Sequence, residues 1–314
     1  MKKLLAILLA LAVVGGVAFA QAAPGLVLSG YVSSGVKYDS STDAVTMQNN
    51  NVSGKQARLR LNANYDNGDF GLKFRFQSND LSAAPLITQM LVKGNLFNKM
   101  ASFKVGKLDD YTYATYWNSY GSFDGVWGAM AMVKPVAGLN IGVYMPATTP
   151  GGTTVLLADS LKGIGIGVAY AADKVGNLVL GGKFFGTTKS AYVGFNFTGV
   201  ENLFAELEAS VPDLSTIAPA VHGQFAYTMD KLTVGTYTDD TIGTTFAWGV
   251  DPYVEYALND MFTAGADFLI DSTNAYTATA YGYVYLGPKA TLKPELSYSS
   301  TKAVVVACSV DWSF

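Results

Sequence analysis

Apolar and polar side chains alternate residue by residue along segments of about ten residues, and this pattern recurs from about residue 25 to the end of the chain. In the segment 57–66, Leu59 and Leu61 share one parity, whereas Arg58 and Arg60 share the other. Successive side chains of a β-strand point to opposite faces, so each segment predicts a strand with one apolar and one polar face. Strands of soluble proteins have about five or six residues, whereas a tilted strand needs about ten to cross a bilayer. The alternation therefore predicts transmembrane β-strands.

The connections between these segments alternate between short turns and generally longer polar links. Eight short turns are predicted, near residues 67–68, 98–99, 134–138, 173–177, 199–202, 229–231, 258–260 and 287–289. Nine links are predicted, at residues 39–54, 79–85, 109–124, 147–159, 212–218, 239–243 and 271–275 and near residues 187 and 300. Seventeen connections join 18 strands, and 16 is the alternative, because the segments 86–108 and 187–211 can be divided differently.

A soluble β-sandwich would also alternate, but its outer face would be polar and its strands shorter. Here the apolar face is unbroken by charge, and the other face carries the glycines, serines, asparagines and charged residues. Short turns at one end and loops at the other are typical of outer-membrane barrels. We therefore predict an all-β fold: a single transmembrane antiparallel β-barrel of about 18 strands, with short periplasmic turns and longer external loops.

The N-terminus contains the only long apolar run. Met1-Lys2-Lys3 is a short positive region, Leu4 to Val17 is apolar, and Ala18-Phe19-Ala20 places small residues where a signal peptidase reads them. This layout predicts a secretory signal peptide at residues 1–20, followed by the barrel at residues 21–314. A retained N-terminal helix anchor is the alternative. After residue 20, no run approaches the 18 or so apolar residues of a spanning helix.

Composition excludes several other classes of protein. With Cys308 as the only cysteine, a disulfide scaffold is impossible, and a net charge of −3 disfavours nucleic acid as a partner. His222 is the only histidine, on the polar parity beside Gln224; a hydrolase that uses it is a rival interpretation. Gly163-Ile164-Gly165-Ile166-Gly167 has no following helix that could bind a phosphate, so its inward glycines either leave room for an in-folded loop or allow close packing. We expect no enzyme activity, no metal and no cofactor.

The last strand carries a resemblance to a known class of proteins. Val310-Asp311-Trp312-Ser313-Phe314, with alternating hydrophobic residues and a terminal Phe, resembles the assembly signal of bacterial outer-membrane barrels. The resemblance implies that Trp312 and Phe314 form this signal. It also implies an outer-membrane location, export through a cleaved signal peptide, and two partners, the outer-membrane lipid and the barrel-assembly machinery.

A second resemblance is to the general diffusion porins. Val105-Gly106-Lys107-Leu108-Asp109-Asp110 and the following residues to Gly125 come after the predicted fifth strand, where the long third loop of porins folds into the barrel and narrows the pore. The resemblance implies a water-filled channel for passive diffusion of small hydrophilic solutes and ions. General porins are homotrimers of 16 strands, whereas 18 strands resemble sugar-specific porins. The alternatives are therefore a sugar-type channel, with the aromatic stretch 111–117 as a stacking track, and a non-conducting structural or adhesive barrel.

All three arginines lie between residues 58 and 75, on the parity that faces the lumen. If Asn67-Gly68 is a two-residue hairpin turn, Arg60 pairs directly with Arg75, and Leu61 with Phe74. Like charges across a ladder are destabilising, so this pairing requires compensation. The predicted basic wall of the pore consists of Arg58, Arg60, Lys73, Arg75, Lys93 and Lys104.

The acidic residues concentrate in the rest of the chain. Residues 21–107 hold ten bases and five acids, net +5, whereas residues 108–314 hold nine bases and 19 acids, net −10. The predicted constriction-loop acids are Asp109, Asp110 and Asp124. The predicted lumen acids of the far wall are Glu206, Glu208, Asp251, Glu255, Asp267 and Glu295. We expect a transverse field that orients polar solutes; the alternative is a wide polar lumen without a constriction.

Overall fold

The computed structural model describes residues 25–48, 57–78, 86–108, 111–114, 126–147, 156–243 and 245–314, so the predicted signal peptide lies outside the described residues. This part is all-β except for one six-residue helix, α2 (Leu157–Lys162). The strands are β1 (Leu26–Asp39), β2 (Ala44–Gln48), β3 (Ala57–Asp66), β4 (Phe70–Ser78), β5 (Leu86–Leu96), β6 (Ala101–Lys107), β7 (Trp127–Val136), β8 (Leu139–Pro146), β9 (Gly165–Ala172), β10 (Gly176–Lys183), β11 (Ser190–Phe197), β12 (Leu203–Val211), β13 (Ala220–Met229), β14 (Leu232–Ile242), β15 (Phe246–Asn259), β16 (Phe262–Asp271), β17 (Tyr276–Gly287), β18 (Ala290–Ser299) and β19 (Val304–Ser313).

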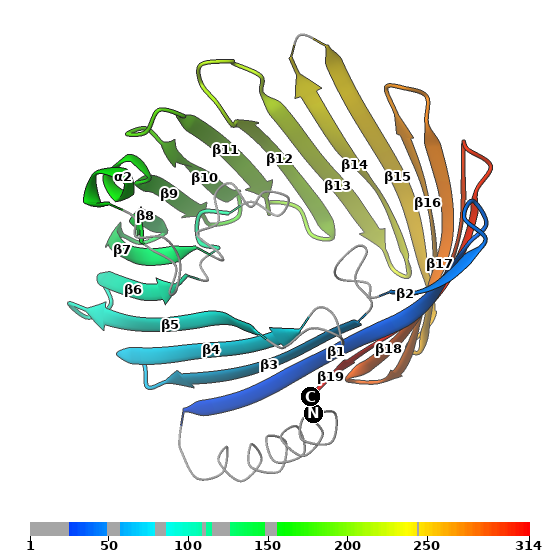
Figure 1. The fold of residues 1–314 in the computed structure, drawn as a ribbon, viewed down its shortest axis with the longest axis horizontal. Helices are drawn as coiled ribbons and strands as arrows, with labels where there is room; N and C mark the ends of the chain where they lie inside the picture. Colours follow the sequence, from blue (N-terminus) through cyan, green and yellow to red (C-terminus); the bar gives the residue numbers. More distant parts are fainter. Residues whose placement is uncertain are drawn as a thin grey trace.

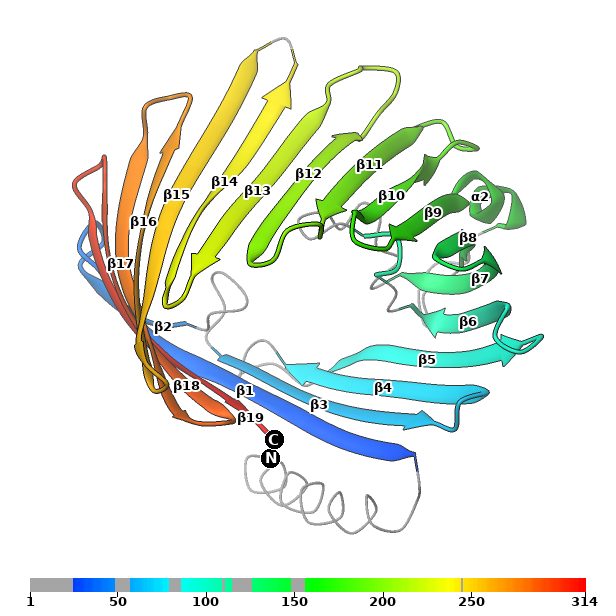
Figure 2. The same ribbon diagram turned by 180° about the vertical axis from the view of Figure 1, so that it is seen from behind.

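Antiparallel pairing between neighbouring strands closes the sheet into a barrel (Figure 1, and from behind in Figure 2). One edge of β1 pairs with β19, from Tyr31 opposite Ser313 to Asp39 opposite Val305. The other edge of β1 pairs with β3 over residues 26–34 and with β2 over residues 35–39. β2 and β3 therefore share one position, and the 19 strands fill 18 positions around the barrel. The prediction of 18 strands is confirmed, and the alternative of 16 is excluded.

The connections alternate between the two ends of the barrel, as the sequence predicts. The short turns join β3 to β4, β5 to β6, and each later odd-numbered strand to the next, up to β17 and β18. The longer links join the remaining neighbours at the other end. Two of these links contain elements that the sequence pattern did not predict: β2 in the first link, and α2 between β8 and β9. Among the described residues, no helix is both long and apolar enough to cross a membrane.

Three connections at the loop end are closed by the same local motif, an Asp two residues before a Ser or Thr. The Asp213 carboxylate accepts hydrogen bonds from the backbone N–H of Ser215 at 2.9 Å and from its hydroxyl at 2.7 Å. These bonds favour the charged form and lower the pKa of Asp213. Asp39 with Ser41 and Asp271 with Thr273 repeat the arrangement. Such turns satisfy backbone N–H groups locally where the chain leaves the strand.

The two faces of the barrel wall differ in polarity. On β12, Leu207 is 61% exposed on the outer face, whereas its neighbour Glu208 is 1% exposed on the lumen face. Exposed apolar side chains on the outer face include Leu72, Val143, Val193, Phe225, Val254, Leu296 and Val306. A soluble protein does not expose so continuous an apolar surface. This outer face suits contact with lipid, as the alternation predicts.

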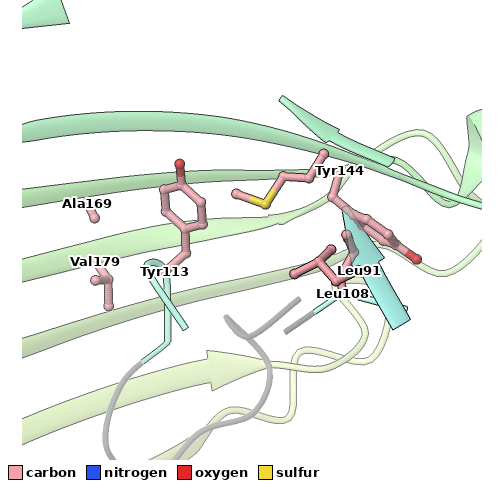
Figure 3. Packing of buried hydrophobic residues seen from close by; sticks show 7 residues of the cluster. Leu91, Leu108, Tyr113, Tyr144, Ala169 and Val179 are labelled. Carbon is pink, nitrogen blue, oxygen red and sulfur yellow. The ribbon is translucent and has the colours of Figure 1, made fainter. Parts of the chain in front are cut away.

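On the lumen face of β5 to β10, the polarity departs from the predicted pattern, because apolar side chains gather there. The buried cluster consists of Leu91, Leu108, Tyr113, Met130, Tyr144, Ala169 and Val179 (Figure 3). Leu108 and Tyr113 belong to the connection between β6 and β7, and both have 0% exposure. This connection therefore packs against the inner wall. The predicted folding of a loop into the lumen is confirmed for the described residues of this connection.

Candidate functional site

The pairing of β3 with β4 differs from the predicted register. Arg60 lies opposite Gln77, Arg75 lies opposite Asn62, and Leu61 lies opposite Phe76, so the predicted pair of Arg60 with Arg75 is wrong. The shift is two residues, and it leaves every side chain on its predicted face because the side-chain period of a strand is two.

The physical reason for the shift is the turn: Asp66 pairs with Gly71, so four residues, 67–70, lie between the paired residues rather than the predicted two. Asp66 Oδ1 accepts a hydrogen bond from the N–H of Gly68 at 2.8 Å. Asn67 Oδ1 accepts hydrogen bonds from the N–H groups of Asp69 at 3.1 Å and Phe70 at 2.8 Å. Gly68 has φ of +93°, a conformation that glycine adopts without strain. The two side chains close a longer turn than the Asn-Gly dipeptide alone suggests.

The shifted register places an amide opposite Arg60 and another opposite Arg75, in place of the predicted pairing of like charges. The Gln77 Oε1 atom accepts hydrogen bonds from Arg60 Nε at 2.9 Å and from an Arg58 Nη atom at 3.3 Å. Asn62 Oδ1 accepts a hydrogen bond from Arg75 Nε at 2.8 Å. The amide oxygens hold the three guanidinium groups on the lumen face without neutralising them. This is the compensation that a concentrated positive charge on one hairpin requires.

The three predicted wall lysines occupy different places. Lys73 lies opposite Asn64 on β3, beside the arginines. Lys93 lies opposite Gly71, close to the β3–β4 turn, and its ammonium contacts the Asp66 carboxylate. Lys104 lies opposite Lys93 on β6. The structure therefore gathers Arg58, Arg60, Lys73 and Arg75 on one hairpin, while Lys93 pairs with a carboxylate at the end of the barrel.

The connection between β6 and β7 packs against a pair of glycines in the barrel wall. Gly142 of β8 and Gly167 of β9 lie opposite each other on the lumen face. A Cβ atom added to Gly142 would lie 2.3 Å from Tyr113 Oη, and one added to Gly167 would lie 2.5 Å from Tyr113 Cγ. The tyrosine ring therefore lies directly on the backbone of these two strands. Gly167 belongs to the glycine-rich segment 163–167. At this position the glycine leaves room for the in-folded loop, which is one of the two interpretations given for the segment. The predicted acids Asp109, Asp110 and Asp124 lie outside the described residues.

The six predicted lumen acids fall into two separate groups. Glu206 and Glu208 lie on β12, nine positions from β3 in either direction around the 18 positions. They therefore lie across the lumen from the arginine hairpin. Asp251, Glu255, Asp267 and Glu295 lie on β15, β16 and β18, which are six, five and three positions from β3. This second group flanks the arginine hairpin rather than facing it.

The acids on β12 are buried within the lumen wall. Glu206 is 8% exposed and accepts a hydrogen bond from Asn196 Nδ2 at 3.4 Å. Glu208 lies opposite His222 on β13, and His222 Nδ1 lies 3.1 Å from an oxygen of Asp239. These residues form a polar network along the wall. Among the described residues, no three His, Cys, Asp or Glu side chains gather as a metal site would require.

The second group of acids lines a hollow in the lumen wall together with tyrosines. The hollow has a volume of about 300 Å³ and is bounded by side chains of β14 to β18. The sequence interpretation missed its tyrosines, which are Tyr237, Tyr253, Tyr281 and Tyr283, and it missed Lys293. The alternation in the sequence could have identified these residues, because it places them on the same lumen-facing side of their strands as the acids beside them.

The last residue of the chain completes the barrel closure. Phe314 and Gly30 exchange two backbone hydrogen bonds, of 2.9 and 3.0 Å. The Phe314 ring lies where a side chain at Gly30 would be, and it contacts the Trp312 ring, with centroids 5.2 Å apart. Both predicted signal residues thus lie at the seam between the first and last strands, and Trp312 is 49% exposed on the outer face.

No protein-family model and no curated protein sequence matches the chain. Solved structures do match its fold. A five-substitution mutant of the porin of Rhodopseudomonas blastica has a TM-score of 0.55 at 16% sequence identity, over 92% of this chain and 100% of that one. A triple mutant of the same porin has a TM-score of 0.54 at 16% identity, and a structure described as "Asymmetric conductivity of engineered proteins" has 0.54 at 15%, with the same coverage. With its 18-position closed barrel and inward-packed connection, the chain folds as a porin-like β-barrel.

Proposed function

We propose that this protein is a passive channel of the bacterial outer membrane that admits small hydrophilic solutes and ions through a water-filled lumen. The proposal rests on one observation: the closed barrel wall separates charged side chains on its inner face from large apolar side chains on its outer face. Arginines, lysines and carboxylates face the lumen, and large apolar side chains face outward. Charged groups are costly to bury without water or partners, so this interior is suited to solvent and polar solutes.

The charge distribution supports a transverse field across the lumen. Arg58, Arg60 and Arg75 lie on one hairpin, and Glu206 and Glu208 lie nine strand positions away. Rings and walls of charge at close quarters set ion selectivity in channels. The inward-packed connection between β6 and β7 narrows the space in which this field acts. The charges on both walls belong to side chains of the protein itself, so the field requires no cofactor or catalytic group.

The same sorting implies the protein's surroundings. The outer apolar face suits lipid, and the alternating strand β19, with Trp312 at its seam with β1, suits recognition by the barrel-assembly machinery. We place the short turns in the periplasm and the longer links outside the cell. Native mass measurement in detergent separates a monomer from the homotrimer that general porins form.

Swelling of proteoliposomes in isosmotic sugar solutions tests the proposal. A passive channel gives swelling rates that fall smoothly with solute mass and do not depend on stereochemistry. Liposomes with heat-denatured protein are the control. No swelling above this control, with a folded barrel, would favour the non-conducting structural or adhesive barrel instead.

One observation favours a second candidate, a substrate-selective channel. The tyrosines of β14, β15 and β17 line a hollow at the lumen surface, and stacked rings there offer a surface for a specific solute. The same swelling experiment separates the two functions. A selective channel gives different rates for stereoisomers of equal mass, and its rate saturates with concentration.

A further inference from the structure

The hollow between β14 and β18 is a built site rather than a gap between strands, because glycines on the wall make room for its tyrosines. Gly235 lies opposite Tyr253, and Gly265 lies opposite Tyr281. A Cβ atom at Gly235 would lie 2.5 Å from Tyr253 Cζ, and one at Gly265 would lie 2.4 Å from the Tyr281 ring. Both rings therefore lie along the wall, directly over the glycines of the neighbouring strands.

The four tyrosine rings of the hollow form two contacting pairs. Tyr237 and Tyr253 stack with centroids 5.1 Å apart and an interplanar angle of 21°. Tyr281 and Tyr283 meet edge to face at 5.6 Å. The Tyr281 hydroxyl donates a hydrogen bond of 3.0 Å to Glu255 Oε1, which fixes the ring. Aromatic faces carry partial negative charge and attract cations.

Carboxylates surround these rings in excess over bases. Asp251, Glu255, Asp267 and Glu295 face one base, Lys293, so the formal charge of the lining is 1 − 4 = −3. Asp251 Oδ1 is buried and makes no hydrogen bond within the described part of the chain. An uncompensated buried carboxylate oxygen is costly, and a cation or donor supplied from solution would satisfy it.

The chain itself shows how an ammonium group is held here. Lys293 Nζ lies 5.4 Å from the Tyr281 ring centroid and 5.7 Å from that of Tyr283, and 3.4 Å from Glu295 Oε2. This combination of two aromatic faces and a carboxylate is a general mode of ammonium recognition. In the same hollow, Asp251 lies opposite Tyr237 and Asp267 lies opposite Tyr253, so a second set of carboxylates lies beside a second pair of aromatic rings.

From this geometry we infer that the hollow is a binding site for a small organic cation with an ammonium group, held by Asp251 and Asp267 against the faces of Tyr237 and Tyr253. The inference deepens the proposed function and rests on it, since the ligand reaches the hollow through the lumen. A neutral sugar would use the rings and hydrogen bonds but would leave the charge of −3 uncompensated. Within the described residues, no acid cluster has the arrangement of a metal site.

Isothermal titration calorimetry of the folded barrel in detergent tests the site, with 1,4-diaminobutane as the probe. Its neutral isostere 1,4-butanediol and glucose are the comparison solutes. We expect saturable binding of the diamine alone, weakened about tenfold or more in the Asp251→Asn, Asp267→Asn double variant, since each tenfold loss corresponds to about 1.4 kcal/mol. Higher salt should weaken binding further, because the interaction is electrostatic. Asp311→Asn, a lumen-parity carboxylate outside the hollow, is the matched control and should retain binding.

The outcomes separate the site from the channel. No saturable binding of the diamine, equal binding by the double variant, or binding of glucose in preference to the diamine would each overturn the inference. If the double variant fails to fold, Tyr253→Leu serves as the second variant and should also weaken binding. Calorimetry does not require conduction, so a barrel that conducts without binding overturns only the site. A barrel that binds without conducting overturns only the proposed channel.

Discussion

Gly167→Ala should release the connection between β6 and β7 from the wall of the barrel while leaving the barrel itself folded. The added methyl group would lie 2.5 Å from Tyr113 Cγ, 2.8 Å from Cδ1 and 3.0 Å from Cβ. Ordinary contacts between such atoms begin near 3.4 Å, so the ring has to move by 3.4 − 2.5 = 0.9 Å. The wall is held by the ladders to β8 and β10, so the connection moves rather than the strand.

This displacement destabilises the conformation in which Tyr113 packs against the barrel wall. Overpacking a well-packed site costs about 1–3 kcal/mol. This corresponds to about a 5- to 150-fold decrease in the equilibrium constant between the connection packed against the wall and the connection released from it. Tyr113→Ala removes the fully buried ring altogether and should cost about 3–5 kcal/mol by analogy with other large aromatic truncations. Two unrelated substitutions, one on the wall and one on the connection, should therefore have the same effect on the channel.

Single-channel recording in planar bilayers measures this effect. We expect both variants to show more open-channel current noise and more conductance substates than the unaltered protein. Gly249→Ala is the matched control, because it adds a methyl group to a lumen-parity glycine whose nearest described neighbour, Asp239 O, is 3.8 Å away. Unaltered noise and conductance in both variants, with the barrel shown to be folded by its gel mobility before and after heating, would show that this connection does not shape the pore.

Three further predictions concern the charged hairpin and the seam of the barrel. Arg60→Ala combined with Arg75→Ala should shift the reversal potential in a salt gradient toward cation selectivity, and an unchanged potential would reject the basic wall. Gln77→Glu should turn the hydrogen bonds from Arg58 and Arg60 into ion pairs between opposite charges, so it should raise Tm and shift selectivity in the same direction; a lower Tm would contradict the hydrogen-bond geometry. Deletion of Phe314 removes two backbone hydrogen bonds to Gly30 and should lower the free energy of unfolding by about 1–3 kcal/mol in urea titrations in detergent, whereas Phe314→Leu should keep both bonds.

The barrel could be predicted because its signals are local. Period-two alternation assigns each residue to a face, and turn residues mark where the chain reverses, so strand count, connection order and facing follow without tertiary information. β2 was not predicted. It pairs with the same edge of β1 as β3 does, beyond the end of β3, and so adds no position to the barrel. The β3–β4 register was wrong because Asn67 and Asp66 close the turn with their side chains, and turn residue identity alone does not reveal that geometry.

The candidate site was predictable only in part, because it depends on residues far apart in the chain. Parity identified Glu206 and Asp251 as lumen residues, but only the closure of β1 on β19 shows that the first faces the arginines and the second flanks them. The apolar lumen face around Met130 and Val179 contradicts simple alternation, because the inward-packed connection covers it. Tyr253 and Tyr281 form part of a site only because Gly235 and Gly265 lie opposite them on neighbouring strands.

The proposed channel requires a continuous water-filled path, lined by charge, through the barrel. Conductance of the purified, folded protein in planar bilayers detects such a path. We expect discrete, stable current steps whose size increases with salt concentration, together with a reversal potential that responds to substitution of the lumen arginines. Folded protein that inserts into the bilayer and gives no stable current steps would contradict it.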